Sequence, residues 1–483
     1  MHTALKEASS AVEGASSHLR ACLDRQRHAF CTGPRPGYEQ RRADLLALRR
    51  MVSDNQAAII QAINTDYGNR SPHETLIAEI IFVLDGINFA LKNLKKWMKP
   101  QRRHVDPLAY PGARNRVIPQ PLGVVGVIVP WNFPLQLGLS PVTCILAAGN
   151  CAMVKMSENS VHLSRLLIRL VPDYFPPEKL AFFEETGEVG IHFSQLPFDH
   201  LLFTGSGRTG KAVMASAAGN LTPVTLELGG KSPAVIALDF PLRKAVERIL
   251  FAKMFNAGQV CVSVDYVFVP ESKLDEFVDE ARKYGRRHCP DIDSRDYTSI
   301  IDEKSFRRLQ ADMADAEAKG ATLVNLAAGR AVTPDNRKLA PHLVLNPNED
   351  MAVLQREIFG PLMPVLSYRH ESEVVDYVNR HETPLSFYPF TNDRTLQNWY
   401  LDQIMSGGVS VNDVMLHVAQ HDLPFGGVGA SGMGVYHGKE GFQTFSKFRP
   451  VFYQARFSAA RYLAPPYGRL ANFVFRLFLK LKS

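Results

Sequence analysis

The sequence predicts an α/β protein with a largely parallel sheet. From residue 124 onward, short apolar segments alternate with stretches of helical periodicity, which is the pattern of strands joined by crossover helices. The segment NCAMVKMSENS at 150–160 precedes a helical stretch at 164–175, and DHLLFTGSGRTG at 199–210 precedes another at 211–219. A β-branched run at 124–129 has the composition of a buried strand and ends at a turn flanked by prolines.

The first 100 or so residues follow a different pattern. Between 41 and 68, apolar residues recur at spacings of three and four, which predicts helices. A connection rich in Pro and Arg follows at 99–116. We find no internal repeat and no low-complexity linker, so domain boundaries have to be placed from motifs.

The bulk composition argues against several classes of protein. The chain has 483 residues, a formal net charge of +7 and six cysteines without a C-x-x-C pair. Lys and Arg are dispersed and no zinc-finger or RNA-binding signature accompanies them, so we expect no nucleic-acid partner. No apolar run suits a signal peptide or a bilayer span. We therefore expect a cytoplasmic protein with free thiols and no metal site.

A glycine pattern indicates a dinucleotide site. Gly205, Gly207 and Gly210 form G-x-G-x-x-G between a predicted strand and a predicted helix. Small residues there let a pyrophosphate approach the backbone N–H groups at the start of a helix. A glycine-rich turn without a ligand is the alternative. Glu227 lies near the position of the acid that holds the adenosine ribose, but the spacing fits a catalytic base equally well.

Two further residues have both a structural and a catalytic interpretation. Asn132 lies in PWNFP, at the end of the predicted strand, where its amide either serves the turn or donates to an oxyanion. Cys261 ends the segment FNAGQVC and is either a nucleophile or a small buried side chain. We expect Cys144 and Cys151 to be buried and inert.

Taken together, these segments resemble the aldehyde dehydrogenase superfamily. The blocks PWNFP, FTGSGRTGK, ELGGKSP, FNAGQVC, EIFGP and LPFGGVGASGMG occur in the order and approximate spacing of that family, and the resemblance runs from about residue 40 to 455. The blocks DYGNRS, VSVDYVFVP, SGGVSVNDVMLHV and GMGVYHGKEGFQTFS are most similar to its class 3-type branch, and within it to bacterial coniferyl aldehyde dehydrogenases.

The resemblance implies an α/β fold in three parts. A Rossmann-type cofactor domain would comprise residues 1–100 and 120–226, and a catalytic domain would comprise 227–420. A small β arm for oligomerisation would come from 100–120 and 430–460, and the branch implies a homodimer.

The resemblance also assigns the catalytic residues. Cys261 would be the nucleophile, Asn132 the oxyanion donor and Glu227 the general base. Attack by the Cys261 thiolate would turn the aldehyde, a poor hydride donor, into a thiohemiacetal that releases hydride and leaves a thioester. Glu227 would then activate the water that hydrolyses it.

Seven further residues would contact an NAD cofactor: Trp131, Lys155, Glu158, Gly205, Ser206, Glu357 and Phe359. Glu158 would accept hydrogen bonds from ribose hydroxyls and would repel a 2′-phosphate, which favours NAD. Lys155 softens this preference and leaves use of NADP open.

The substrate would be an aromatic aldehyde of the cinnamaldehyde type, such as coniferaldehyde, or a medium-to-long aliphatic aldehyde. A CoA-acylating semialdehyde dehydrogenase is an alternative, but such enzymes commonly lack the base that Glu227 would supply. A membrane-associated fatty aldehyde dehydrogenase is another alternative, and a scaffold without activity is a third.

The last segment, 461–483, is not explained by the resemblance. Apolar residues at 470, 473, 474, 477, 478 and 481 form a helical stripe beside basic residues. One hypothesis is a helix that docks on its own or a partner subunit. The other is a helix that contacts an anionic membrane surface or caps the substrate tunnel.

Overall fold

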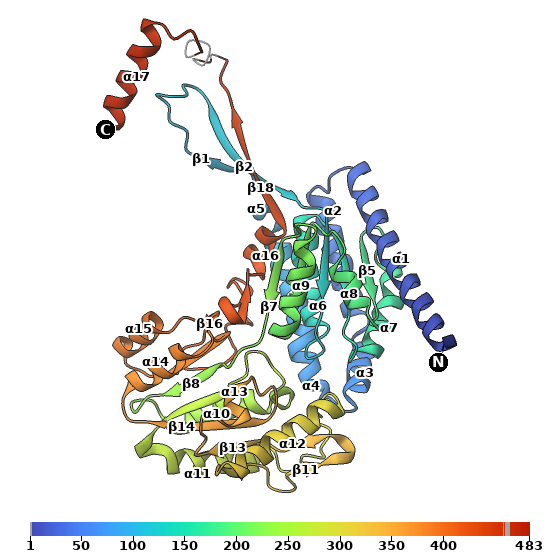
Figure 1. The fold of residues 1–483 in the computed structure, drawn as a ribbon, viewed down its shortest axis with the longest axis vertical. Helices are drawn as coiled ribbons and strands as arrows, with labels where there is room; N and C mark the ends of the chain where they lie inside the picture. The colour runs from blue at the N-terminus through green and yellow to red at the C-terminus, as the bar shows by residue number, and fades with distance from the viewer. Residues whose placement is uncertain (1, 457, 459–463) are drawn as a thin grey trace.

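The computed structural model describes residues 2–456, 458 and 464–483, with side chains from residue 16 onward. Two sheets, each covered by helices, form most of the molecule, and a thin arm extends from one end (Figure 1). The predicted alternation of strands and helices is present, and the helices predicted in the first 100 residues are α1 to α5.

The first sheet has six strands in the order β17-β7-β6-β3-β4-β5, and every pair except β17 with β7 is parallel. Its strands are β3 (Val124–Ile128), β4 (Cys151–Lys155), β5 (Leu180–Phe183), β6 (His200–Thr204), β7 (Val224–Glu227) and β17 (Gly432–Met433). The helices around it include α1 (His2–Thr32), α2 (Tyr38–Ser53), α3 (Gln56–Tyr67), α5 (Phe82–Trp97), α6 (Gln136–Ala148), α7 (Val161–Leu170), α8 (Val189–Ser194), α9 (Gly207–Ala218) and α16 (Gly438–Thr444).

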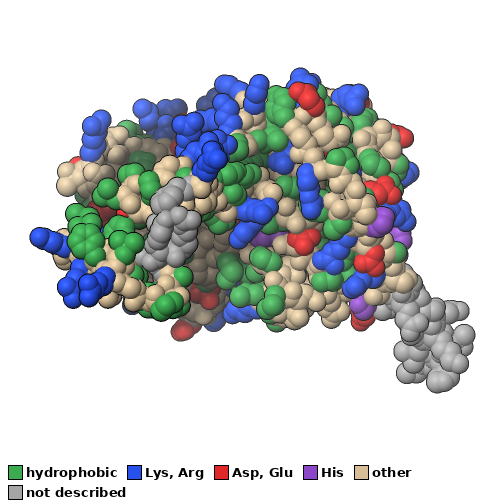
Figure 2. All heavy atoms as spheres, turned by 90° about the horizontal axis from the view of Figure 1, so that it is seen from above, with side chains coloured by type: hydrophobic (Ala, Val, Ile, Leu, Met, Phe, Trp, Pro, Cys, Tyr) green, Lys and Arg blue, Asp and Glu red, His purple; other side chains and the backbone are tan. Residues whose placement is uncertain are grey.

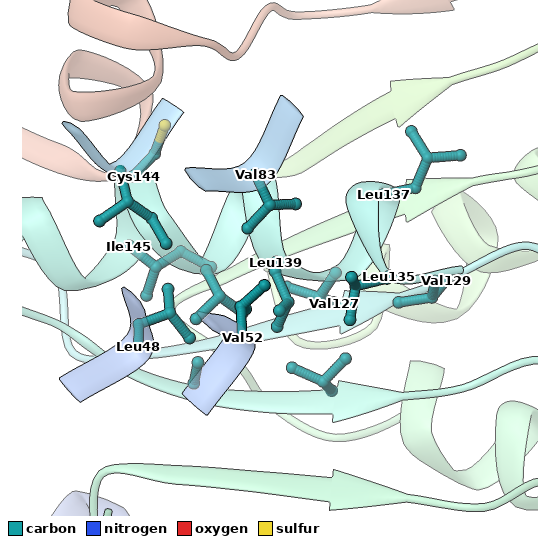
Figure 3. Close-up of a cluster of buried hydrophobic side chains, with 14 of the residues drawn as sticks. Leu48, Val52, Val83, Val127, Val129, Leu135, Leu137, Leu139, Cys144 and Ile145 are labelled. Atoms are coloured by element: carbon teal, nitrogen blue, oxygen red, sulfur yellow. The ribbon is translucent and has the colours of Figure 1, made fainter. Parts of the chain in front are cut away.

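Strand β3 lies inside this sheet and is buried on both faces. Val125 and Val127 pack with side chains of α2, α5 and α6, and Figure 3 shows part of this cluster. Val124 and Ile128 pack on the other face with side chains of α1, α8 and α9. The apolar run at 124–129 is therefore continuous because a strand covered on both faces has no polar side.

The second sheet has seven strands in the order β10-β13-β14-β9-β8-β15-β16, and only the edge strand β10 runs antiparallel. Its strands are β8 (Pro233–Ile236), β9 (Tyr266–Pro270), β10 (Thr322–Asn325), β13 (His342–Leu345), β14 (Leu362–Tyr368), β15 (Ser386–Phe390) and β16 (Gly408–Val409). The helices that accompany it are α10 (Leu242–Met254), α11 (Leu274–His288), α12 (Glu303–Ala318), α13 (Ala352–Gln355), α14 (Glu371–Arg380) and α15 (Arg394–Gln403). β11 (Val332–Thr333) and β12 (Lys338–Leu339) form a separate pair.

The arm is a three-stranded antiparallel sheet that joins distant parts of the sequence. Its strands are β1 (Gln101–Arg103), β2 (Arg114–Pro121) and β18 (Ser446–Tyr453), in that order. The last helix, α17 (Arg469–Lys482), lies beside the tip of the arm (Figure 1). Within the described part of the chain, none of the helices has the length and hydropathy needed to cross a membrane.

Candidate active site

The loop that carries Cys261 has a strained backbone. It follows α10 through η3 (Phe255–Gly258), where Asn256 and Ala257 have φ near +50° and Gly258 has φ of +72°. A non-glycine residue in this region costs about 1–3 kcal/mol and persists only when its surroundings enforce it. Gly258 is also required by space, because a Cβ there would lie 2.3 Å from the carbonyl oxygen of Gly360.

Two buried amides enforce this loop conformation. The Asn256 side chain donates to the Gln259 carbonyl oxygen at 3.0 Å, and the Gln259 side chain donates back to the Asn256 carbonyl oxygen at 2.9 Å. Gln259 also donates to the Ser299 carbonyl oxygen and accepts from the Ile301 backbone N–H. The block FNAGQVC is therefore a set of residues that build one fixed turn in front of Cys261.

Asn132 lies against this turn. It follows β3 and is buried, and its side-chain nitrogen is 3.4 Å from the Gln259 carbonyl oxygen. Its backbone carbonyl oxygen accepts three hydrogen bonds, from the Tyr67 hydroxyl at 2.9 Å, Arg70 at 3.0 Å and the Asn256 side chain at 3.3 Å. Asn132 is thus held between the N-terminal helices and the loop of Cys261.

A buried ion pair supports Asn132, and the sequence analysis did not identify it. Arg70 and Glu79 are 2.8 Å apart, and both side chains are inaccessible to solvent. The Arg70 guanidinium lies 4.9 Å from the ring centres of both Tyr67 and Phe133. Glu79 is in the π-helical turn η1 (Leu76–Ile81) and accepts from the first backbone N–H groups of the segment that becomes α6, at 2.8 Å each.

Glu227 is a buried carboxyl group at the end of β7. Both carboxyl oxygens are buried, and neither has a hydrogen-bond partner among the described residues. Burial raises the pKa of Glu227 well above its ordinary value. A buried polar group without a protein partner is costly, so its retention points to a chemical role.

One cavity joins most of the predicted site residues. It has a volume of about 290 Å³ and lies between the two sheets. Residues at the ends of β3, β6 and β7 form one wall, and residues from Cys261 onward, in and around the second sheet, form the other. The predicted site residues that line it are Trp131, Asn132, Gly205, Ser206, Glu227, Cys261, Glu357 and Phe359.

The loop of Glu357 and Phe359 is fixed by a second ion pair. Lys231, from the block ELGGKSP, pairs with Asp265, and Asp265 accepts from the Ile358 backbone N–H at 2.9 Å. The Glu357 carboxylate packs against Gly229, where any Cβ would collide with it. Burial, followed by the charge of Asp265, raises the pKa of Glu357 to about 8.

Phe359 has a φ of +48° and lies edge-to-face with Trp131, with ring centres 5.3 Å apart. These two rings come from opposite walls of the cavity. Together they form an apolar, aromatic surface near Cys261.

The glycine-rich turn lies at the start of α9. Ser206 caps this helix by accepting from the Thr209 backbone N–H, and Gly205 precedes it on the cavity wall. The first N–H groups of a helix have no partner within the helix, so this end suits a pyrophosphate.

Lys155 and Glu158 do not line the cavity. Lys155 ends β4 next to β3 and pairs with the Glu185 carboxylate at 2.5 Å, which the sequence analysis did not foresee. Glu158 is exposed, and the Ser157 hydroxyl lies 3.3 Å from its carboxylate. The described residues contain no group of His, Cys, Asp and Glu side chains suited to a metal ion.

A model of the aldehyde dehydrogenase family matches residues 6–451. The chain belongs to this family. A probable coniferyl aldehyde dehydrogenase of Pseudomonas aeruginosa is 49% identical to it over 96% of this chain and 97% of that protein. The substrate-bound structure of Staphylococcus aureus AldH has a TM-score of 0.89 and 33% identity, and the match covers 95% of this chain and 99% of that chain. A Mycobacterium tuberculosis aldehyde dehydrogenase complexed with NAD+ has a TM-score of 0.82 and 26% identity, with 92% of each chain covered.

These matches confirm the family, the α/β fold and the enzyme class expected from the sequence. This aldehyde dehydrogenase is an oxidoreductase that acts on aldehydes with a nicotinamide cofactor. The described residues fit such a cofactor, because the start of α9, the Glu357 loop and the Trp131–Phe359 pair border the cavity that holds Cys261.

The Cys261 thiol is predicted to be neutral in the enzyme without cofactor. Burial, followed by the charges of Glu357 and Glu227, raises its pKa to about 12. Far below the pKa, the thiolate fraction grows about tenfold for each pH unit. Alkylation of Cys261 by iodoacetamide should therefore accelerate about tenfold per unit from pH 7 to the alkaline limit of stability.

The rate is best measured by peptide mass spectrometry in a Cys31→Ala variant, because Cys31 is the exposed thiol. A rate that levels off below the ordinary thiol pKa of 9.0 would contradict this prediction.

Proposed function

We propose that this aldehyde dehydrogenase oxidises a cinnamaldehyde-type aromatic aldehyde, such as coniferaldehyde, to its carboxylic acid with NAD. The observation that carries the proposed chemistry is that the Cys261 thiol, the Asn132 amide and the unpartnered Glu227 carboxyl border one cavity. The substrate class is supported by the P. aeruginosa relative and by the aromatic and aliphatic walls, which include Trp131, Leu137, Leu385 and Phe425.

The first step adds Cys261 to the aldehyde. The thiol loses its proton to solvent, and a bond forms between the sulfur and the carbonyl carbon. The carbonyl oxygen becomes an oxyanion that the Asn132 side-chain N–H and the Cys261 backbone N–H stabilise. Asn132 suits this role because three hydrogen bonds fix its backbone carbonyl oxygen, which holds in place the chain from which the side-chain amide projects.

The second step releases the acid. A bound nicotinamide would supply the acceptor for the hydride that leaves the carbon, and Cys261 would keep the acyl group as a thioester. Glu227 takes a proton from water, the water oxygen attacks the thioester carbon, and the sulfur leaves as thiolate. A raised pKa makes the Glu227 carboxylate a stronger base than an exposed glutamate once it is ionised.

The preference for NAD follows from Glu158 and Glu185. Lys155 is paired with Glu185, which reduces the positive charge that it would offer to a 2′-phosphate. Glu158 is exposed and would repel that phosphate. We propose that Lys155 and Glu158 contact the adenosine ribose.

We also propose a cytoplasmic homodimer with the domain boundaries inferred from the family resemblance. All six cysteines are free, as in proteins of reducing compartments. β18 is an eight-residue edge strand of the arm, and such a strand presents N–H and C=O groups that a second chain can pair with.

Replacing the proposed nucleophile should abolish turnover. Cys261→Ala should lower kcat for coniferaldehyde by about a thousandfold or more, because no other group in the cavity can form the thioester. The measurement is NADH formation with coniferaldehyde, benzaldehyde, hexanal and decanal, each with NAD and with NADP. Cys31→Ala is the matched control and should keep full activity. Normal turnover by Cys261→Ala would refute the mechanism, and a preference for decanal would refute the substrate class.

Removing the proposed base should separate formation of the thioester from its hydrolysis. Glu227→Gln keeps the shape of the side chain, so one NADH per site should still form in a burst. Steady turnover should fall by about 10²–10⁴-fold because hydrolysis lacks its base. Intact-protein mass spectrometry should then show the acyl group on the enzyme. An unchanged steady rate, or no burst and no adduct, would assign Glu227 a different role.

A further inference from the structure

The positive charge of the molecule is concentrated at the arm and at α17. Residues 99–121 and 446–483 contain thirteen Lys and Arg and a single acidic residue, Asp106. These two segments therefore carry a formal charge of +12, whereas the whole chain carries +7 and the remainder is net negative. The expectation that Lys and Arg are dispersed is wrong for these two segments. They are far apart in the chain but meet in the arm.

Helix α17 adds exposed apolar side chains to this basic surface. Phe473 is 64% exposed and Leu481 is 59% exposed, and Leu470 and Leu477 are exposed as well. The helix contains Arg469, Arg476, Lys480 and Lys482 and no acidic residue. Figure 2, which views the molecule from the end with the arm, shows apolar and basic side chains gathered together on this face.

One of the described contacts of α17 is with the arm. Ala471 is its one buried residue, Phe475 lies edge-to-face with Tyr467, and Lys482 pairs with Asp106 of the arm at 3.4 Å. The stripe of Leu470, Phe473, Leu477 and Leu481, at spacings of three and four residues, remains exposed to solvent.

We propose that α17 and the arm bind the surface of an anionic lipid bilayer. The exposed stripe enters the boundary between head groups and acyl chains, and the basic side chains of α17 and the arm contact lipid phosphates. At 14 residues the helix is about 21 Å long, too short for the ~30 Å hydrocarbon core, so it lies along the surface.

Two other occupants fit this surface less well. A second copy of α17 would bring four more positive charges without an acid, so self-pairing is opposed by repulsion. A nucleic acid would neutralise the basic residues but would leave the exposed Phe and Leu side chains without an apolar partner. An anionic lipid surface offers phosphates to the basic side chains and an apolar partner to the exposed Phe and Leu side chains.

The proposal does not depend on the substrate or the catalytic residues. No residue of α17 borders the cavity of Cys261. The structure therefore gives no support for α17 as a cap on the tunnel of its own chain, which was one of the hypotheses from the sequence.

Flotation with vesicles tests this proposal on the full-length protein. The probes are vesicles of phosphatidylcholine alone and of phosphatidylcholine with about one third phosphatidylglycerol. The variant Phe473→Ser/Leu477→Ser removes two exposed side chains of the stripe. Leu238→Ser is the matched control, because Leu238 is 62% exposed and lies outside the arm and α17.

The wild type and Leu238→Ser should float with anionic vesicles, about tenfold or more above neutral vesicles. Phe473→Ser/Leu477→Ser should remain unbound while it keeps its melting temperature and its turnover of benzaldehyde. Absence of flotation by the wild type, equal flotation with neutral vesicles, or flotation unaffected by the double substitution would overturn the proposal. The proposal would also be overturned if Phe473→Ser/Leu477→Ser sedimented as a smaller oligomer, because α17 would then be a subunit contact. Binding of duplex DNA without binding of vesicles would overturn it as well.

Discussion

The buried ion pair of Arg70 and Glu79 is the interaction on which the geometry of the active site depends. It ties a π-helical turn of the N-terminal region to the carbonyl oxygen of Asn132, and Glu79 also holds the start of α6. Removing one partner of such a pair leaves a buried charge without compensation, at a cost of about 3–5 kcal/mol. The pair therefore fixes the backbone carbonyl of Asn132, which lies against the strained loop that presents Cys261.

Local patterns predicted much of this structure. The strand at 124–129 could be predicted because burial on both faces leaves a continuous apolar run. The family and enzyme class followed from blocks that are short and contiguous in sequence. FNAGQVC is such a block, because its left-handed residues and amides are all needed within one turn. The roles of Cys261, Asn132 and Glu227 remain proposals, although the structure brings all three to one cavity.

Contacts between distant segments could not be predicted in the same way. Arg70 lies 62 residues from Asn132, and Lys155 lies 30 residues from Glu185. A buried charge has the same sequence signature as a surface charge, so neither of these contacts, nor the ion pair of Arg70 with Glu79, can be predicted from the sequence. The block DYGNRS, which contains Tyr67 and Arg70, carries the family resemblance but does not indicate that these two residues contact Asn132. The concentration of positive charge on the arm also arises from contacts between distant segments, because β1 and β2 lie far from β18 in the sequence.

A double-mutant cycle tests most directly whether Arg70 acts through Asn132. Arg70→Lys keeps the charge beside Glu79 but loses the planar guanidinium that contacts both Glu79 and the Asn132 carbonyl. If Arg70 positions the Asn132 amide, Arg70→Lys should lower kcat about tenfold or more with KM little changed, and should have no further effect in an Asn132→Ala background. Effects on kcat that multiply in the double variant would contradict this account, because the two residues would then act independently.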